Sequence, residues 1–205
     1  MLTCGTVRRR AFRAIPRDGV ERLAPGETAA AFAPGDFILT HGSAWTSKLI
    51  RFGQRLRIHG DDRKYTYWNH AALVVSDAGD LVEALGAGVM RTKIDKYRPV
   101  EYHLVRVGAS GADRSEVVAF GEWAAGDAAG DSRQGYGFLT LVSIAYTLLT
   151  GGKFTFSIEG QMICSGLVAR AEERTKAIFN RTPSHIMPAD LAKYYDAEPP
   201  ESTSP

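Results

Sequence analysis

Residues 65–75 constrain the fold of this chain more than any other stretch, because they are aromatic at first and then mostly apolar. This pattern predicts a central strand of a sheet. The residues 76–79 have the composition of a turn, and residues 80–85 favour a returning strand, so a hairpin is expected. Two further short strands are expected at 89–94 and 102–107. Short strands joined by tight turns favour an antiparallel sheet.

Helices are expected before and after these strands in the sequence. A strand at 37–40 precedes a helix that Ser43 can cap. The apolar residues of this helix recur at helical spacing and predict a stripe that packs in the core: Trp45, Leu49, Phe52 and Leu56. Its basic residues are expected to face solvent: Lys48, Arg51, Arg55 and Arg57. Further helices are expected at 115–125, at 138–149, from Cys164 to about 179, and within 185–195.

The length of 205 residues suits one domain with a sizeable core. Residues 1–32 are rich in Arg, Ala and Pro, and we interpret them as a basic, solvated N-terminal arm. Residues 33–195 are expected to form the domain. Residues 196–205 are polar and rich in proline, so a flexible tail is expected there.

The composition limits which class of protein and which cellular compartment are expected. A hydrophobic content of 44% and a charged content of 23% are ordinary for a soluble globular protein. The 25 basic and 23 acidic residues nearly balance, and the formal charge of +2 does not indicate binding to nucleic acid. The longest apolar run, 138–149, is too short to span a bilayer, so no stable membrane span is expected. Cys4 and Cys164 give no disulfide framework, and residues 1–10 lack the apolar run of a secretory signal. The cytoplasm is therefore the default location, with export by a specialised route as the alternative.

Cys164 stands where an irregular segment becomes an apolar run of helical period. The first amides of a helix have no partners inside it, and the helix dipole favours negative charge there. A thiolate is stabilised at such an end, and the thiolate is the reactive form of cysteine. A single cysteine in an apolar helix is nevertheless more often small core filler. The interpretation of Cys164 as a nucleophile therefore depends on partners elsewhere in the chain.

His70 and Glu83 are the partners that the sequence offers to such a thiol. If the hairpin loop has an even number of residues, both side chains lie on the same face of the sheet. A diagonal pair has Cβ atoms at most about 7–8 Å apart, which a long side chain can bridge. A carboxylate beside the imidazole would fix its tautomer and stabilise its charged form. Asn69 and Asp77 are alternatives to Glu83 as the group that orients His70.

The other histidines carry weaker signals. Loop, edge-strand or turn roles are expected for His59, His103 and His185, and His41 is either a turn residue or a residue of a cleft. There is no His-Glu-x-x-His or Cys-x-x-Cys motif in the sequence, so neither a metal site nor a cofactor is expected.

Five segments in this order resemble the circularly permuted NlpC-type papain fold, and most closely its YiiX-like branch: 35–39, 69–75, 82–89, 163–168 and 188–191. The resemblance covers about residues 33 to 192. It implies an α+β fold, in which a small antiparallel sheet packs against helices that include a cysteine-bearing helix. It also implies a catalytic domain at 33–195, with Cys164 as nucleophile, His70 as base and Glu83 as the group that orients His70.

The family resemblance implies thiol-mediated acyl chemistry but leaves the acyl donor open, because relatives include cell-wall peptidases, amidases and lecithin-retinol-acyltransferase-like enzymes. The first expectation is a cysteine peptidase or amidase acting through an acyl-enzyme on a peptidoglycan-type peptide. The second is a lipid-directed thiol acyltransferase or lipase, which an apolar cleft lined by Trp45, Trp68, Tyr136 and Phe138 would favour. The third is a non-catalytic binding module, which a deeply buried Cys164 would favour.

The remaining site residues follow from that chemistry. The backbone amide of Cys164 is expected to meet the developing oxyanion, with Gln161 or a group in the loop 41–43 as the second donor. Contacts to a peptide or lipid acyl substrate are expected from Trp45, Trp68, Tyr136, His41 and Ser43.

Overall fold

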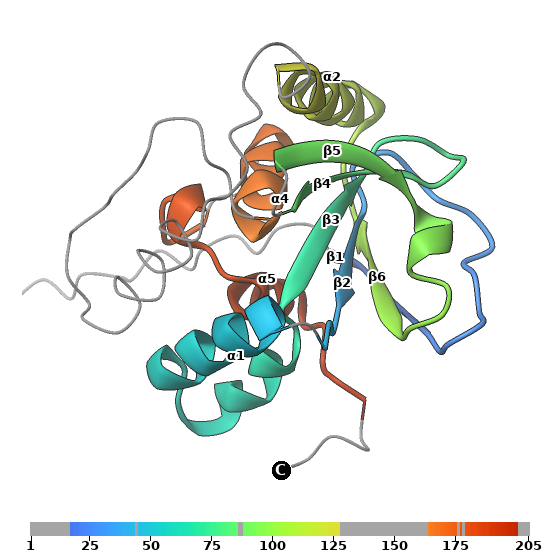
Figure 1. Cartoon of the computed structure of the whole chain (residues 1–205). Coiled ribbons are helices and arrows are strands. Elements are labelled where there is room, and N and C mark those ends of the chain that lie inside the picture. The colour runs from blue at the N-terminus through green and yellow to red at the C-terminus, as the bar shows by residue number, and fades with distance from the viewer. Residues whose placement is uncertain are drawn as a thin grey trace, which may run out of the picture.

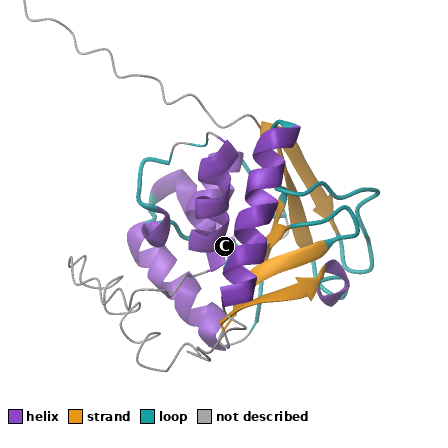
Figure 2. Ribbon diagram, turned by 90° about the horizontal axis from the view of Figure 1, so that it is seen from above, coloured by secondary structure: helices purple, strands orange, loops and turns teal. Residues whose placement is uncertain are grey.

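The computed structural model describes residues 17–43, 45–85, 88–127, 164–175, 177 and 179–200. They form a six-stranded sheet with the order β1-β6-β2-β3-β4-β5, in which all neighbouring strands are antiparallel. Figure 1 shows α4 beside the sheet, and Figure 2 shows the longer helices gathered on one side of the strands. The expected α+β class with an antiparallel sheet is therefore confirmed.

The strands are β1 (Arg17–Leu23), β2 (Phe37–Thr40), β3 (His70–Val74), β4 (Asp80–Leu85), β5 (Gly88–Lys93) and β6 (Tyr102–Val107). The α-helices are α1 (Trp45–Arg57), α2 (Gly111–Asp127), α4 (Cys164–Glu172) and α5 (Pro188–Tyr195). Short 3-10 helices connect them: η1 (Gly60–Tyr67), η2 (Ile94–Lys96), η3 (Glu173–Thr175) and η4 (Pro183–His185). Among the described residues, no helix is both long and apolar enough to cross a membrane.

Strand β3 is apolar on both faces because the sheet is covered on both sides. Successive side chains of a strand point to opposite faces. Leu73 packs in a cluster with residues of α2, α4 and α5, whereas Val74 packs in a second cluster with Leu104 and other residues on the opposite face. This double burial explains the continuous apolar run that predicted a central strand.

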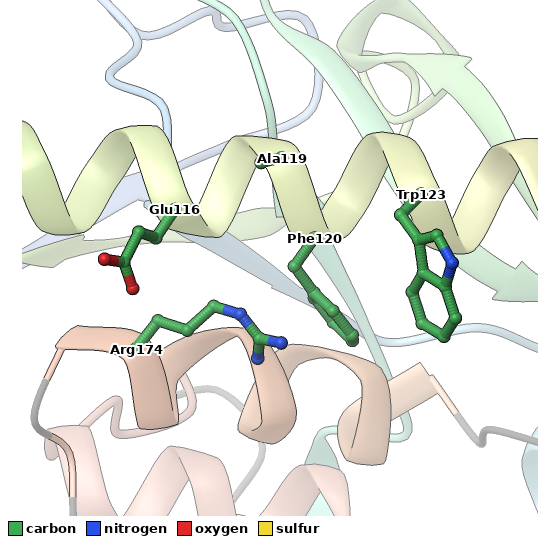
Figure 3. A pocket seen from close by; sticks show the side chains of 5 residues that line it. All are labelled: Glu116, Ala119, Phe120, Trp123 and Arg174. Carbon is green, nitrogen blue, oxygen red and sulfur yellow. The ribbon is translucent and has the colours of Figure 1, made fainter.

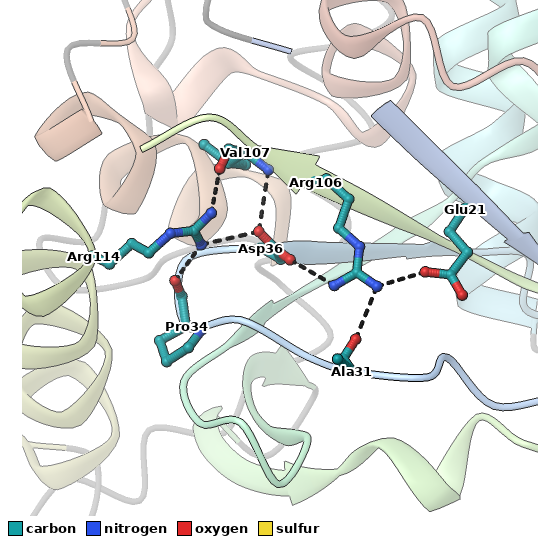
Figure 4. Close-up of polar contacts among 7 residues, drawn as sticks. All are labelled: Glu21, Ala31, Pro34, Asp36, Arg106, Val107 and Arg114. Atoms are coloured by element: carbon teal, nitrogen blue, oxygen red, sulfur yellow. Dashed lines mark hydrogen bonds and ion pairs between the residues drawn. The ribbon is translucent and has the colours of Figure 1, made fainter. Parts of the chain in front are cut away.

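A buried aspartate joins β2 to β6 and α2 (Figure 4). Asp36 has no exposed surface, and its carboxylate accepts hydrogen bonds from the Val107 amide at 3.1 Å, Arg114 Nη1 at 3.0 Å and Arg106 Nη1 at 3.1 Å. A buried carboxylate costs free energy unless it is partnered, so both arginines and the amide are needed at this position. Arg106 also donates to Glu21 on β1 at 2.5 Å, which ties the edge strand to the same cluster.

Part of the expected N-terminal arm is a strand of the sheet. Strand β1 pairs with β6, with Val20 opposite Val105 and Leu23 opposite Tyr102. The expectation of a solvated segment up to residue 32 is therefore wrong from Arg17 onward. Apolar and polar residues do not alternate clearly in the sequence of β1. The strand is stabilised by pairing with β6, about eighty residues away in the sequence.

The expected tail also begins later than predicted. Ala197 has no exposed surface, and its carbonyl accepts a hydrogen bond from Trp68 Nε1 at 2.8 Å. The Tyr65 hydroxyl donates to Asp196 at 2.8 Å. The beginning of the predicted flexible segment is thus packed against η1. The expected helix at 138–149 lies outside the described residues.

Helix α1 lies in its expected place but is rotated relative to the expected orientation. Phe52 is 55% exposed and Leu56 is 43% exposed, whereas Gln54 is completely buried. The Gln54 amide donates to the Trp68 carbonyl at 2.8 Å, and its oxygen accepts from the Ala189 amide at 2.9 Å. Gln54 faces the interior because the buried carbonyl of Trp68 and the buried amide of Ala189 need hydrogen-bond partners. The prediction of a core-facing stripe is therefore wrong for Phe52 and Leu56.

Candidate active site

His70 and Glu83 are in direct contact across the β3–β4 hairpin. Val74 pairs with Leu81, so residues 75–80, an even number, lie between the paired positions and meet the condition for a shared face. His70 Nε2 donates to Glu83 Oε2 at 2.7 Å. This contact leaves Nδ1 as the imidazole nitrogen that is available to another partner.

Glu83 is buried completely and accepts hydrogen bonds from four side chains. Besides His70, the donors are Thr92 Oγ1 at 2.6 Å, Lys96 Nζ at 2.7 Å and the Tyr97 hydroxyl. Burial by itself raises the pKa of Glu83, but the bonds from His70, Lys96, Thr92 and Tyr97 outweigh burial and lower the pKa to about 2. Glu83 is therefore an anion over the physiological pH range.

Cys164 is the first residue of α4, which packs on β3. The β3–β4 pairing stops at Leu73 and Val82, although β3 continues back to His70. The amide of Val75 donates to the carbonyl of Asp80 on β4. Because successive backbone amides of a strand point to opposite neighbouring strands, the amide of Ala71 also points toward the β4 side. Ala71 N–H instead forms a hydrogen bond with Cys164, and so does the amide of Ser165. The thiol therefore occupies the place where the two strands separate.

Cys164 and His70 form a hydrogen-bonded, electrostatically coupled pair. Burial disfavours the charged form of each group. For Cys164, burial raises the pKa, but the charge and hydrogen bond of His70 and the two amides outweigh it and lower the pKa below its ordinary value. For His70, burial lowers the pKa, but Cys164 and Glu83 outweigh it and raise the pKa to about 9. The Cys164 thiolate and the His70 imidazolium therefore stabilise each other.

The loop 41–43 is held beside His70 by Asn69. Asn69 accepts from the Gly42 amide at 2.8 Å and donates to the Gly42 carbonyl at 3.0 Å. Since Asn69 is occupied by Gly42 and Asp77 is an exposed turn residue, neither takes the place of Glu83 beside His70. The Gly42 amide is also occupied, and both ring nitrogens of His41 are engaged, which leaves Ser43 as the side chain of this loop that could supply a second oxyanion donor.

His41 is held by two neighbours. Its Nδ1 donates to the Tyr67 carbonyl at 2.8 Å, and its Nε2 accepts from Arg51 Nη1 at 3.2 Å, which fixes the tautomer. The His41 ring also stacks on Tyr67, with ring centroids 4.2 Å apart. Ser43 is exposed. His41 and Ser43 follow Thr40, the residue of β2 that pairs with His70.

The structure contradicts the expected substrate contact of Trp68. Its side chain has no exposed surface, its Nε1 donates to the Ala197 carbonyl, and its ring packs against His103 at 4.4 Å between centroids. Trp68 is therefore a core residue that anchors the C-terminal segment. The other predicted contacts, Gln161, Tyr136 and Phe138, and the side chain of Trp45, lie outside the described residues.

The sequence analysis missed Thr92, Lys96 and Tyr97 as partners of Glu83. Thr92 could have been found from parity, because β5 pairs with β4 and positions 90 and 92 share the face of Glu83. Lys96 and Tyr97 reach Glu83 only because η2 turns the chain back after β5, which no local pattern predicts.

A separate surface hollow lies between α2 and η3, lined by Phe120, Trp123, Arg174 and neighbouring residues (Figure 3). Cys164, His70 and Glu83 are not among the residues that line this hollow. Among the described residues, no group of three or more His, Cys, Asp or Glu side chains could hold a metal ion. The sequence matches no known family model and no curated protein.

Proposed function

We propose that this chain is a cysteine hydrolase of the peptidase or amidase type, which acts through an acyl-enzyme at Cys164. The observation that carries the proposal is the coupled pair of Cys164 and His70, with Glu83 bonded to the second nitrogen of the imidazole. A nucleophile, a base and a group that orients the base are the requirements of covalent acyl transfer. The resemblance to the permuted NlpC-type papain fold supports the same conclusion and suggests a peptidoglycan-type peptide as the substrate.

The proposed reaction begins with the thiolate of Cys164 attacking a carbonyl carbon, which forms a carbon–sulfur bond and an oxyanion. The oxyanion is stabilised by amides at the start of α4. His70 then donates its proton to the leaving amine as the carbon–nitrogen bond breaks. The neutral imidazole next removes a proton from water, which attacks the thioester and releases the acid and the thiolate. Glu83 stays ionised throughout and holds His70 in place.

A lipid-directed thiol acyltransferase or lipase is the second candidate, and it would use the same three side chains. The exposed apolar residues Phe52 and Leu56 on α1 favour it, because an enzyme of lipids needs access to an apolar phase. Turnover of peptide amides and of acyl esters, each compared between the native chain and Cys164→Ala, separates the two candidates. Unchanged turnover in Cys164→Ala would exclude both.

A thiol probe tests the site without knowledge of the substrate. Because the thiolate is the reactive form, iodoacetamide at about pH 6 is expected to label Cys164 faster than Cys4 of the same chain. His70→Ala is expected to slow the labelling of Cys164 and to leave that of Cys4 unchanged. Two results would favour the non-catalytic binding module. Cys164 is labelled equally fast in the native chain and in His70→Ala, or Cys164 stays unlabelled in the native chain.

A further inference from the structure

Helix α1 exposes apolar and basic side chains together. Phe52 is 55% exposed and Leu56 is 43% exposed, and Lys48 and Arg55 are exposed beside them. The four positions follow the spacing i, i+4, i+7 and i+8, which lies on one face of a helix. The helix sequence contains four basic residues and no acidic residue. We call this surface of Lys48, Phe52, Arg55 and Leu56 the α1 face.

The orientation of the α1 face is fixed by the rest of the molecule. Gln54, on the opposite side of the helix, is completely buried and bonded to the Trp68 carbonyl and the Ala189 amide. Turning Phe52 inward would remove Gln54 from both partners and leave buried polar groups unpaired. The exposure of the apolar pair is therefore built into the fold.

The α1 face is also close in the chain to the candidate active site. Thr40 pairs with His70 on the neighbouring strand, and the loop 41–43 leads from Thr40 into α1. Arg51 of α1 donates to His41 in that loop. A surface on which α1 rests would therefore be close to the start of β3, where His70 lies.

We propose that the α1 face docks on an anionic lipid bilayer. This inference goes beyond the proposed function and does not depend on it. Interfacial helices place Phe and Leu at the boundary of headgroups and acyl chains, while Lys and Arg meet the anionic headgroups. A protein partner fits less well, because protein interfaces are depleted of lysine, whereas Lys48 lies within the α1 face. In the α1 face, Lys48 and Arg55 lie directly beside Phe52.

Vesicle co-sedimentation of the full chain tests the proposal. Binding is expected to vesicles of phosphatidylcholine with phosphatidylserine, to weaken with added salt, and to be far weaker with phosphatidylcholine alone. Lys48→Gln with Arg55→Gln is expected to lower the partition coefficient about 25-fold at low salt, roughly fivefold for each cation. Phe52→Ser with Leu56→Ser is expected to lower it by roughly tenfold or more.

Trp123→Ser is the matched control, because Trp123 is 57% exposed, close to the value for Phe52. It lies on α2, which Figure 1 shows at the opposite end of the molecule from α1, and Glu116 lines the same hollow in Figure 3. Vesicle binding of Trp123→Ser is expected to equal that of the native chain. Unchanged unfolding temperatures in all variants would show that the losses come from the surface.

Three outcomes would overturn the proposal. The native chain fails to sediment with the mixed vesicles, or the variants of the α1 face bind as well as Trp123→Ser does. The third outcome is that the native chain does not bind vesicles but binds polyglutamate through Lys48 and Arg55. This result would identify an acidic protein as the partner.

Discussion

At the scale of single residues, Glu83 contributes to the charge state of the site. Four donors surround a carboxylate that has no exposed surface, and one of them is the imidazole of His70. Against its burial, Cys164 first and Glu83 after it raise the pKa of His70, and the charge and hydrogen bond of His70 in turn lower the pKa of Cys164. The reactivity of the thiol therefore depends on a residue of β4 as well as on His70.

Glu83→Gln removes this charge and keeps the shape of the side chain. The pKa of His70 is expected to fall, because the imidazolium loses its anionic partner. The pKa of Cys164 is then expected to rise, since less positive charge faces the thiolate. The alkylation rate follows the thiolate fraction, so its dependence on pH is expected to move to higher pH. Iodoacetamide labelling of Cys164 across a pH series measures the displacement.

Asp77→Asn is the control for this prediction, because it removes an exposed carboxylate from the turn of the same hairpin. Its labelling profile is expected to match that of the native chain. A profile of Glu83→Gln that also matches would mean that Glu83 has no electrostatic effect on the thiol.

The sequence predicted the contact of His70 with Glu83 but not the complete environment of the carboxylate. The contact followed from strand parity, which depends only on loop length. Tyr97 and Lys96 reach Glu83 through the turn of η2, and Ala71 meets Cys164 because β3 and β4 separate. Such contacts arise from the three-dimensional course of the chain, so no local pattern predicts them.

At the scale of elements, α1 shows why helical periodicity alone gave the wrong orientation. The apolar stripe indicated a buried face, yet Gln54 is the residue at the core. Its partners, the Trp68 carbonyl and the Ala189 amide, lie 14 and 135 residues away in the sequence. The free energy of leaving these buried groups unpaired exceeds what burial of a partly exposed Phe52 would add.

Gln54→Leu makes α1 more apolar but is expected to destabilise the protein. The change leaves a buried carbonyl and a buried amide without partners, which costs about 1–3 kcal/mol for each group. The free energy of unfolding is therefore expected to fall by roughly 2–4 kcal/mol in a urea titration. Phe52→Gln is the control on the same helix, with an expected change within about 0.5 kcal/mol because the position is exposed. A larger loss in Phe52→Gln than in Gln54→Leu would contradict the orientation of the helix.

At the scale of the whole molecule, both ends of the described chain are tied to the sheet and its supporting helices. Strand β1 extends the sheet at one edge, and the segment after α5 packs against η1. The order of the middle elements could be predicted from local patterns. The ends could not, because β1 and Ala197 depend on partners far away in the sequence, at β6 and Trp68.

Truncation of the C-terminal segment tests how far it supports the fold. A chain that ends at Asp196 loses Ala197, whose carbonyl accepts from the buried Trp68 Nε1, and loses Glu198, which pairs with Lys64. The unpaired indole N–H alone costs about 1–3 kcal/mol. The exposed pair with Lys64 adds little, because solvent screens it. Urea unfolding is expected to show a loss of roughly 1–3 kcal/mol in total.

A chain that ends at Pro200 keeps both contacts and is expected to unfold like the complete chain. Because Trp68 directly precedes Asn69 and His70, loss of its anchor is also expected to loosen the strand that carries the imidazole. Labelling of Cys164 should therefore slow in the chain ending at Asp196 and stay unchanged in the chain ending at Pro200. Equal stability and equal labelling of the two truncated chains would mean that the segment after α5 contributes nothing to the fold. That result would restore a free tail from residue 196.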